Sequence, residues 1–330
     1  MSRSYYMKLS KIWLAGFMLT YGVNATDIEQ DHIHVDGNDV ERHLALKPSE
    51  GTESYAWLME NNRGLKLNVL SAEELPTTID HRDLCSDVWD QGKLGSCTGF
   101  ASKSAAELVW NVLTPDQKGK FIGSALFQYY NERVLEQTVE EDSGATISDA
   151  IKAMMIYGLA PDEDWNYEGY QEKYRLKPSE KAYEDAKEHK DLDKYAQAYI
   201  GNDPLAIKSA LFHKHGVIIG VAVYKSFMSP EVAKSGMVPV PNTFMEDQIG
   251  GHALHVVGYD DTNKWYIVKN SWSAKWGDQG YCYLPYKYVH NKNLAFEVWS
   301  VAKMGAELSS SSASSSSQYG WYNPLRWMGY

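Results

Sequence analysis

One cysteine stands at a position in the chain where a thiol could act as a nucleophile. Cys97 follows the glycine-bearing segment 90–96 and precedes a run in which apolar residues recur at helical spacing. The free N–H groups and partial positive charge of a helix N-terminus favour a thiolate over a thiol. The Cys97 N–H could face a developing oxyanion, and the side chain of Gln91, six residues earlier, could supply a second donor.

Two histidines, His252 and His255, lie in the segment 250–259, which reads Gly-Gly-His-Ala-Leu-His-Val-Val-Gly-Tyr. We place His252 at the junction of a loop and a strand. Because side chains alternate along a strand, residues three apart face opposite sides, so only one of the two can face Cys97. We assign the role of base to His252 and a structural role to His255.

A third segment could orient that base. It reads Lys-Asn-Ser-Trp at 269–272 and continues with Trp-Gly-Asp-Gln-Gly-Tyr at 276–281. The amide oxygen of Asn270 can accept a hydrogen bond from an imidazole N–H and so fix the tautomer of the ring. Trp272 could cover this hydrogen bond and exclude water, which would strengthen it.

The order Gln, Cys, His, Asn and the motifs QGKLGSC, GHALHVVGY and KNSWSAKWGDQGY resemble those of the papain-like cysteine peptidases. The resemblance covers roughly residues 75–304, and the third motif is its most specific part. It implies an α+β fold with two lobes, a helical N-terminal lobe and a β-sheet, barrel-like C-terminal lobe, with the active site in the cleft between them. It also implies an enzyme that hydrolyses peptide bonds without a cofactor or a metal.

Carried over residue by residue, the resemblance implies five roles. Cys97 would be the nucleophile, His252 the general base and later acid, and Asn270 the residue that orients the imidazole. Gln91 would donate to the oxyanion, and Trp272 would shield Asn270 from water.

The resemblance also suggests a substrate cleft. Ser143 to Thr146 would be the strip that hydrogen-bonds the substrate backbone, with Gly144 and Ala145 at its centre. The pocket for the side chain two positions before the cut would be lined by Ile147, Ala222, Gly250 and Ala253. These small and apolar walls predict a preference for leucine, valine or aromatic residues.

The segment around the nucleophile departs from the family pattern. Many members have Cys-Gly-Ser-Cys-Trp there, whereas this chain has Leu94-Gly95-Ser96-Cys97-Thr98. The family disulfide made by the first of those cysteines cannot form, and a threonine replaces the usual aromatic residue. The resemblance is therefore to a bacterial branch of the family. The 155-residue interval from Cys97 to His252 exceeds the usual ~130–150, and we place the extra residues in the charged stretch 171–195.

Apolar periodicity and turn residues predict helices in the first half of this domain and strands in the second. The predicted helices span 97–113, 124–137, 148–157 and 204–214, and the predicted strands span 195–200, 217–224, 254–259, 265–269 and 280–284.

Four parts of the chain differ in composition. Residues 1–25 have the basic start, the apolar stretch and the Val-Asn-Ala end of a signal peptide, so we expect export to the periplasm or the cell exterior. Residues 26–74, with 11 acidic and 4 basic residues, form a leader and a possible propeptide, in which 55–70 could be a short amphipathic helix. The peptidase domain would span 75–304, and 305–330 would be a serine-rich linker with an aromatic tail.

Composition narrows the classes of partner. The formal charge of −11 argues against a nucleic-acid partner, because phosphate binding needs clustered lysine and arginine. The apolar stretch of the signal is too short to span a bilayer, which argues against a membrane anchor. No later segment is long and apolar enough to span, so we expect no membrane span after removal of the signal. His213 and His215 lack a set of further metal ligands. We expect a monomer that acts on a peptide or protein.

The three cysteines allow a disulfide. Exported proteins usually pair their cysteines, so Cys85 and Cys282 could form a bond that leaves Cys97 free, although three pairings are possible.

Two alternative functions stay open at this point. The same residues could transfer an acyl group to an amine, as in a transpeptidase or ligase. Alternatively, the chain could be a catalytically silent module that binds peptides without cleaving them.

Overall fold

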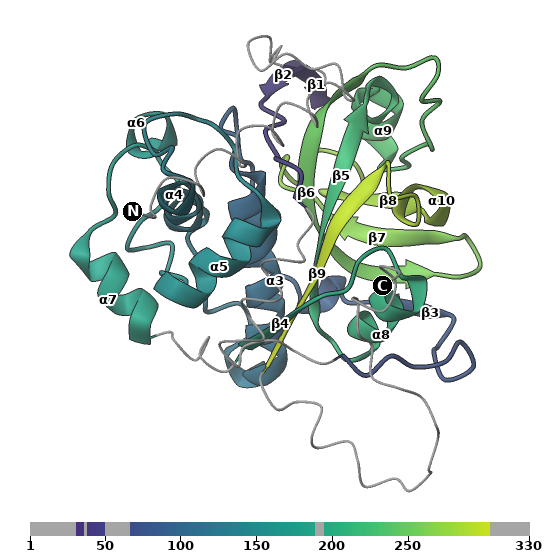
Figure 1. The fold of residues 1–330 in the computed structure, drawn as a ribbon, viewed down its shortest axis with the longest axis horizontal. Coiled ribbons are helices and arrows are strands. Elements are labelled where there is room, and N and C mark those ends of the chain that lie inside the picture. The colour runs from purple at the N-terminus through teal and green to yellow at the C-terminus, as the bar shows by residue number, and fades with distance from the viewer. Residues whose placement is uncertain (1–30, 36–37, 50–66, 189–194, 304–330) are drawn as a thin grey trace, which may run out of the picture.

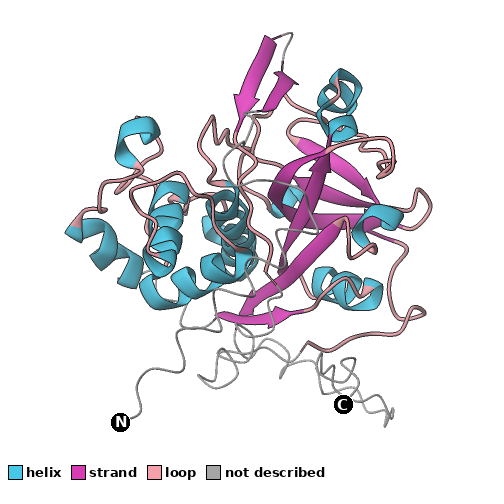
Figure 2. Ribbon diagram, turned by 45° about the horizontal axis from the view of Figure 1, so that its top comes forward, coloured by secondary structure: helices cyan, strands magenta, loops and turns pink. Residues whose placement is uncertain are grey.

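Two lobes of different secondary structure lie side by side (Figure 1). This computed structural model describes residues 31–35, 38–49, 67–188 and 195–303. Figure 2 shows helices gathered in one lobe and a single large sheet in the other. The predicted α+β architecture with two lobes is therefore confirmed. None of the described helices is both long and apolar enough to cross a membrane.

The helical lobe is built around one long helix that begins at the predicted nucleophile. This helix, α3, spans Cys97–Leu113 and packs against the sheet of the other lobe. Ser124 and Thr146 cap the next two helices by accepting backbone N–H groups three residues on. All three agree with the predicted helices to within one residue at each end. The other helices of this lobe are α4 (Ala125–Glu136), α5 (Ile147–Tyr157), α6 (Tyr170–Lys173) and α7 (Glu180–Glu188).

The second lobe is an antiparallel sheet with the order β4-β9-β5-β6-β7-β8, and β3 pairs with β6. The strands are β3 (Thr78–Asp80), β4 (Tyr195–Tyr199), β5 (Gly216–Tyr224), β6 (Gln248–Asp260), β7 (Trp265–Lys269), β8 (Tyr281–Pro285) and β9 (Ala295–Lys303). Short helices flank the sheet: α8 (Pro204–Phe212), α9 (Pro230–Ser235) and α10 (Tyr286–Val289).

The start of β6 corrects one prediction. The strand begins at Gln248 rather than Leu254, so His252 lies inside a strand and not at its junction with a loop. Gly250 and Gly251 read as a loop in the sequence, but they pair with Val223 and Ala222 of β5. Tertiary pairing thus overrides the weak strand propensity of glycine.

Part of the predicted leader packs onto both lobes. The strands β1 (Asp31–Val35) and β2 (Asn38–Arg42) form a hairpin, which Figures 1 and 2 both place at the top of the junction between the lobes. Residues 43–49 then run between the lobes. The described residues 67–70 are not helical, and Leu67 is buried in the core of the sheet lobe. The rest of the helix expected at 55–70, the signal sequence 1–25 and the tail 305–330 lie outside the described residues.

The predicted disulfide is absent, since Cys85 and Cys282 are both free thiols. The strand β8 explains why. Tyr281 and Cys282 are adjacent in it, so their side chains point to opposite faces of the sheet. Cys85 packs with Tyr281 between the lobes, whereas Cys282 lies in the core on the other face. Burial raises the pKa of the Cys85 thiol to about 11.

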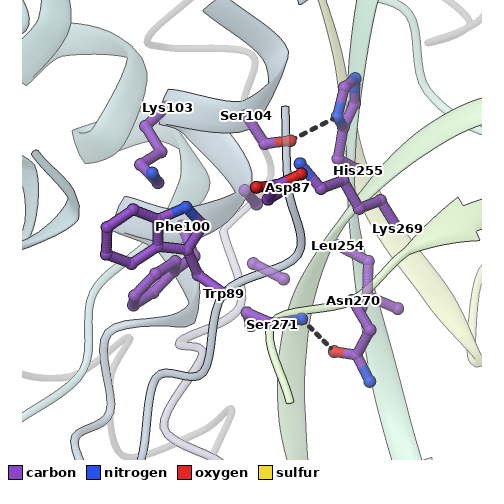
Figure 3. Close-up of a pocket in the computed structure, with 12 residues that line it drawn as sticks. Asp87, Trp89, Phe100, Lys103, Ser104, Leu254, His255, Lys269, Asn270 and Ser271 are labelled. Carbon is purple, nitrogen blue, oxygen red and sulfur yellow. Dashed lines mark hydrogen bonds between the residues drawn. The ribbon is translucent and has the colours of Figure 1, made fainter. Parts of the chain in front are cut away.

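A buried ionic cluster fixes α3 to the surrounding chain. Glu107 accepts hydrogen bonds from Lys103 (3.1 Å), from the backbone N–H of Gly123 (2.8 Å) and from the hydroxyl of Ser86. The ammonium of Lys103 also lies 4.4 Å from the centre of the Trp89 ring. Figure 3 shows Lys103 and Trp89 beside a small pocket between the lobes. Both charged side chains are almost fully buried. Removing either partner would leave a buried charge unpaired and lower the stability of the protein.

Glu107→Ala should lower the free energy of unfolding by about 3 to 5 kcal/mol, because it leaves the Lys103 charge buried without its partner. Urea denaturation measures this loss. The matched control is the double variant Lys103→Met and Glu107→Met, which removes both charges and should recover most of the stability. A loss below about 1 kcal/mol in the single variant would contradict this role.

Candidate active site

The thiol of Cys97 is held between the two lobes. Cys97 is the first residue of α3 and is completely buried. Two backbone N–H groups are directed at its sulfur, those of Thr98 in the same helix and of Ala253 in β6. The sulfur therefore lies against the residue that follows His252. The first turn of α3 therefore lies beside the middle of β6, the strand that carries the predicted base.

His252 is fixed by an amide and a tryptophan. Its Nε2 lies 2.8 Å from Oδ1 of Asn270, and the same oxygen accepts the backbone N–H of Ser271 (2.7 Å). The indole of Trp272 stacks on the imidazole, with ring centres 4.7 Å apart and planes at 20°. Because an amide oxygen can only accept, Nε2 must carry the proton. Nδ1 then stays unprotonated and, among the described residues, has no hydrogen-bond partner.

His255 points to the opposite face of β6, as predicted. Its Nδ1 lies 2.9 Å from the hydroxyl of Ser104 in α3 (Figure 3). Burial lowers the pKa of this imidazole well below its usual range, so it stays neutral. His255 therefore joins α3 to the sheet and stands apart from the thiol.

The loop before α3 holds the Gln91 side chain in one orientation. Its Oε1 accepts the hydroxyl of Ser271 (2.7 Å), and its Nε2 donates to the Leu94 carbonyl (3.0 Å). Tyr167 donates to the Gln91 carbonyl (2.8 Å) and hydrogen-bonds Ser96 (2.6 Å). A side-chain amide has two N–H groups, so one remains available for a developing oxyanion.

Burial sets the charge state of this pair. It raises the pKa of the Cys97 thiol to about 12, although the N–H groups of Ala253 and Thr98 oppose the shift. It lowers the pKa of His252 to about 4, against the opposing effect of the hydrogen bond that the imidazole donates to Asn270. The sequence predicted a thiolate at the helix N-terminus. In this covered state desolvation outweighs the helix, and the pair is a neutral thiol beside a neutral imidazole.

The cover over the pair is a stretch of the predicted leader. We call residues 41–49 the leader strand. The N–H of Leu46 donates to the Gly251 carbonyl (3.2 Å), the Gly251 N–H donates to the Leu44 carbonyl (3.4 Å), and the Lys47 N–H donates to the Ala145 carbonyl (3.0 Å). The leader strand thus joins the edge of β6 to the loop before α5.

The residues predicted to bind substrate lie along the leader strand. A Cβ on Gly144 would meet the Ala45 carbonyl, and one on Gly250 would meet Leu44. Leu46 is buried in one cluster with Cys97, Ile147 and Ala253. Ala222 pairs with Gly251 in the sheet and packs in the core that holds Leu44. The leader strand therefore occupies the cleft in which a peptide was expected.

Two buried glutamates of this region escaped the sequence analysis. Glu132 accepts the hydroxyl of Thr98, and burial raises its pKa to about 8. Glu297 accepts the N–H of Ser148 (2.6 Å), has a φ of 51°, and burial raises its pKa to about 7. Thr98 was the one available signal, since a small polar residue in place of an aromatic leaves room for a buried partner. Nothing in the sequence pattern marked Glu297.

No group of three or more possible metal ligands occurs among the described residues. The groups that the structure does place here are a buried thiol at a helix N-terminus and an oriented imidazole in the neighbouring strand, which suit nucleophilic catalysis.

Comparisons with known proteins agree with this geometry. Residues 75–301 match the papain family of cysteine proteases. An uncharacterized peptidase C1-like protein of Acanthamoeba polyphaga mimivirus is 41% identical over 221 residues, which are 65% of this chain and 69% of that protein. Cathepsin S of Rattus norvegicus is 25% identical over 232 residues. These residues make up 67% of this chain and 63% of that protein, which is less than two thirds of its length.

Solved structures show the same relationship. Xylellain, a cysteine protease from Xylella fastidiosa, is 30% identical, with a TM-score of 0.63 over 74% of this chain and 92% of that one. A digestive procathepsin L 3 of Tenebrio molitor shares the fold at 18% identity, with a TM-score of 0.54 over 92% of this chain. The chain belongs to the papain family of cysteine proteases.

Proposed function

We propose that this protein hydrolyses peptide bonds through a thioester formed on Cys97. The observation that carries the proposal is the His252–Asn270 hydrogen bond, which leaves Nδ1 as the basic nitrogen of the ring. Nδ1 takes the thiol proton, and the thiolate attacks the carbonyl carbon of the substrate. The Cys97 N–H and the Gln91 amide stabilise the oxyanion.

Collapse of that intermediate breaks the peptide bond. The His252 imidazolium gives its proton to the leaving amine, so the thioester forms with a neutral imidazole beside it. His252 then removes a proton from water, which attacks the thioester and releases the carboxylic acid. Cys97 regains its proton and the cycle closes without a cofactor.

We also propose that the leader strand keeps the precursor inactive. Its backbone bonds to Gly251 and Ala145 use groups that a substrate backbone would need. It also excludes water from Cys97 and His252, and this desolvation disfavours the thiolate–imidazolium pair. Removal of the leader would therefore open the cleft and at the same time favour the thiolate of Cys97 and the imidazolium of His252.

The first test is hydrolysis before and after the leader is cut. A recognition sequence for a site-specific protease is placed within residues 50–66, so that the whole chain folds before it is nicked. The nicked chain should cleave a fluorogenic peptide with leucine or phenylalanine two positions before the cut. Its rate should exceed that of the intact chain, and Cys97→Ala should lower it roughly 10³-fold or more.

The outcomes separate the alternatives. A nicked chain no more active than the intact one would contradict inhibition by the leader strand. Coupling of an added amine in preference to water would indicate an acyl transferase on the same residues. A nicked chain that binds peptide without consuming it would indicate the silent module.

Gln91→Ala should lower kcat roughly 10²-fold, because it removes one oxyanion donor, and should change KM little. Steady-state kinetics of the nicked chain measure both. The matched control is Ser271→Ala, which removes a hydrogen bond to Oε1 of Gln91 but keeps the donating amide. Equal losses in the two variants would mean that Gln91 acts only by holding the loop.

Alkylation of Cys97 should report the charge state directly. In the intact chain the raised pKa of the thiol keeps it protonated at neutral pH, so the rate with iodoacetamide should be low and rise about tenfold per pH unit between pH 6 and 8. In the nicked chain the rate should be at least ~10²-fold higher and nearly independent of pH. Mass spectrometry follows the Cys97 peptide, with buried Cys282 as the internal control. Equal rates and pH profiles in the two forms would contradict this account.

We further propose that the chain is exported, on the strength of the signal pattern in residues 1–25. Expression with its own N-terminus should give a secreted or periplasmic product that begins at Thr26, as N-terminal sequencing would show. Retention of Met1 in the cytoplasm would contradict it.

A further inference from the structure

The leader strand carries a distinctive sequence, with basic residues on both sides of an apolar centre. It reads Glu-Arg-His-Leu-Ala-Leu-Lys-Pro-Ser from residue 41 to residue 49. Leu44 and Leu46 are buried against the sheet lobe. The three basic residues, Arg42, His43 and Lys47, flank this centre.

Each basic residue of the leader strand meets a carboxylate of the cleft. Arg42 Nη2 lies 2.7 Å from Oδ1 of Asp90, and His43 Nδ1 lies 2.8 Å from Oδ2 of Asp142. Lys47 pairs with Glu136, which is largely buried. The leader strand also has one acidic residue near the cleft, Glu41, which pairs with the exposed side chain of Lys93.

The peptidase domain itself holds these carboxylates in place. Asp142 accepts the backbone N–H of Gly95 (3.0 Å) and the hydroxyl of Tyr129 (2.5 Å). Glu136 accepts the backbone N–H of Thr146 (3.2 Å). Such groups stay oriented when the leader strand leaves, so binding a second cation there would need little rearrangement.

Asp90 is held in the same way, by the backbone N–H of Gly92 (2.8 Å). Its side chain is 44% exposed even under the leader strand. It would therefore attract a cation mainly over a distance, and the effect should weaken with salt.

Two further carboxyl groups, those of Glu132 and Glu297, are buried beside the cleft. Burial raises their pKa values to about 8 and about 7, so neither adds a full negative charge at neutral pH. Burial raises the pKa of Glu136, and its pairing with Lys47 opposes this shift and favours the carboxylate. When the leader strand leaves, Asp142 and Glu136 lose their His43 and Lys47 partners, and basic side chains of a bound peptide could take their places.

We propose that this cleft selects cationic peptides in which basic residues flank a short apolar segment, with Asp142 and Glu136 as specificity-determining residues and Asp90 in support. This inference rests on the proposed peptidase function. The leader strand is then a built-in example of the sequence class that the cleft binds. This proposal agrees with the apolar pocket expected from the sequence. It adds a preference for basic residues on both sides of the apolar segment of the substrate.

The test uses the nicked full chain with Cys97→Ala, so that binding is measured without cleavage. The probes are peptides with two apolar cores, Leu-Ala-Leu and Val-Ala-Phe, each flanked on both sides by lysine, glutamine or glutamate. Displacement of a fluorescently labelled leader fragment reports their affinity. Lysine-flanked peptides should bind at least ~10-fold more tightly than glutamine-flanked ones, and glutamate-flanked peptides more weakly still.

Variants assign this preference to the carboxylates. Glu136→Gln and Asp142→Asn should each lower the ratio of lysine-flanked to glutamine-flanked affinity, and Glu136→Lys should shift it towards glutamate-flanked peptides. A ratio cancels any loss of correctly folded protein, because both affinities come from the same sample. The matched control is Glu180→Gln, which removes an exposed carboxylate on α7 and should leave the ratio unchanged.

The two proposals fail separately. Equal affinity for lysine-flanked and glutamine-flanked peptides with both cores would overturn the charge preference, even if the nicked wild-type chain hydrolyses them. A strong lysine preference without any hydrolysis would support the charge preference and contradict the peptidase function. An unchanged ratio in both Glu136→Gln and Asp142→Asn would overturn the assigned residues.

Discussion

The close packing of α3 against the sheet is the constraint on which the site depends. A Cβ on Gly216 of β5 would lie 2.5 Å from the Ala105 carbonyl of α3, and one on Gly99 of α3 would lie 2.6 Å from the Ala125 carbonyl of α4. Only glycine permits these approaches. They fix α3 between the sheet and α4, and at the first turn of α3 the sulfur of Cys97 lies against the backbone N–H of Ala253 in β6. Nucleophile and base come from different lobes, and neither lobe alone forms the site.

The same packing bears on the proposed inhibition by the leader strand. Cys97 and His252 are completely buried, and Leu46 of the leader strand packs in the same cluster as Cys97. Desolvation opposes charge on both partners and favours the neutral thiol and imidazole. The hydrogen bond to Asn270 and the stacked Trp272 keep the imidazole oriented while the leader strand is in place. Under the proposal, the geometry of the site is already formed and release of the leader strand changes its ionisation.

The identity and order of the candidate catalytic residues could be predicted from the sequence. The strand and the contacts around them could not. Helix α3 begins at Cys97, where the glycine-bearing loop ends. This local sequence pattern predicted the start of the helix correctly. The extent of β6 was missed because Gly250 and Gly251 have little intrinsic strand preference and depend on pairing with β5. The Cys85–Cys282 bond was a statistical expectation about exported proteins, and the alternation of side chains in β8 rules it out here.

Long-range contacts account for the other omissions. Glu297 meets Ser148 across 149 residues of sequence, and Glu136 meets Lys47 across 89, so no local pattern could have paired them. The predicted substrate residues Gly144, Ile147, Gly250 and Ala253 do line the path of the leader strand. The pocket prediction described their small size correctly but omitted the carboxylates around them.

The central claim is that covering the cleft holds the catalytic pair neutral and that opening it produces the ion pair. Nitrogen-15 NMR of the His252 ring, at neutral pH in intact and nicked chains, tests it most directly, with nicked Cys97→Ala as the reference. The account predicts a neutral ring protonated at Nε2 in the intact chain and a doubly protonated ring after nicking, but not in the Cys97→Ala reference. A ring that is doubly protonated in the intact chain, or neutral in the nicked one, would contradict it.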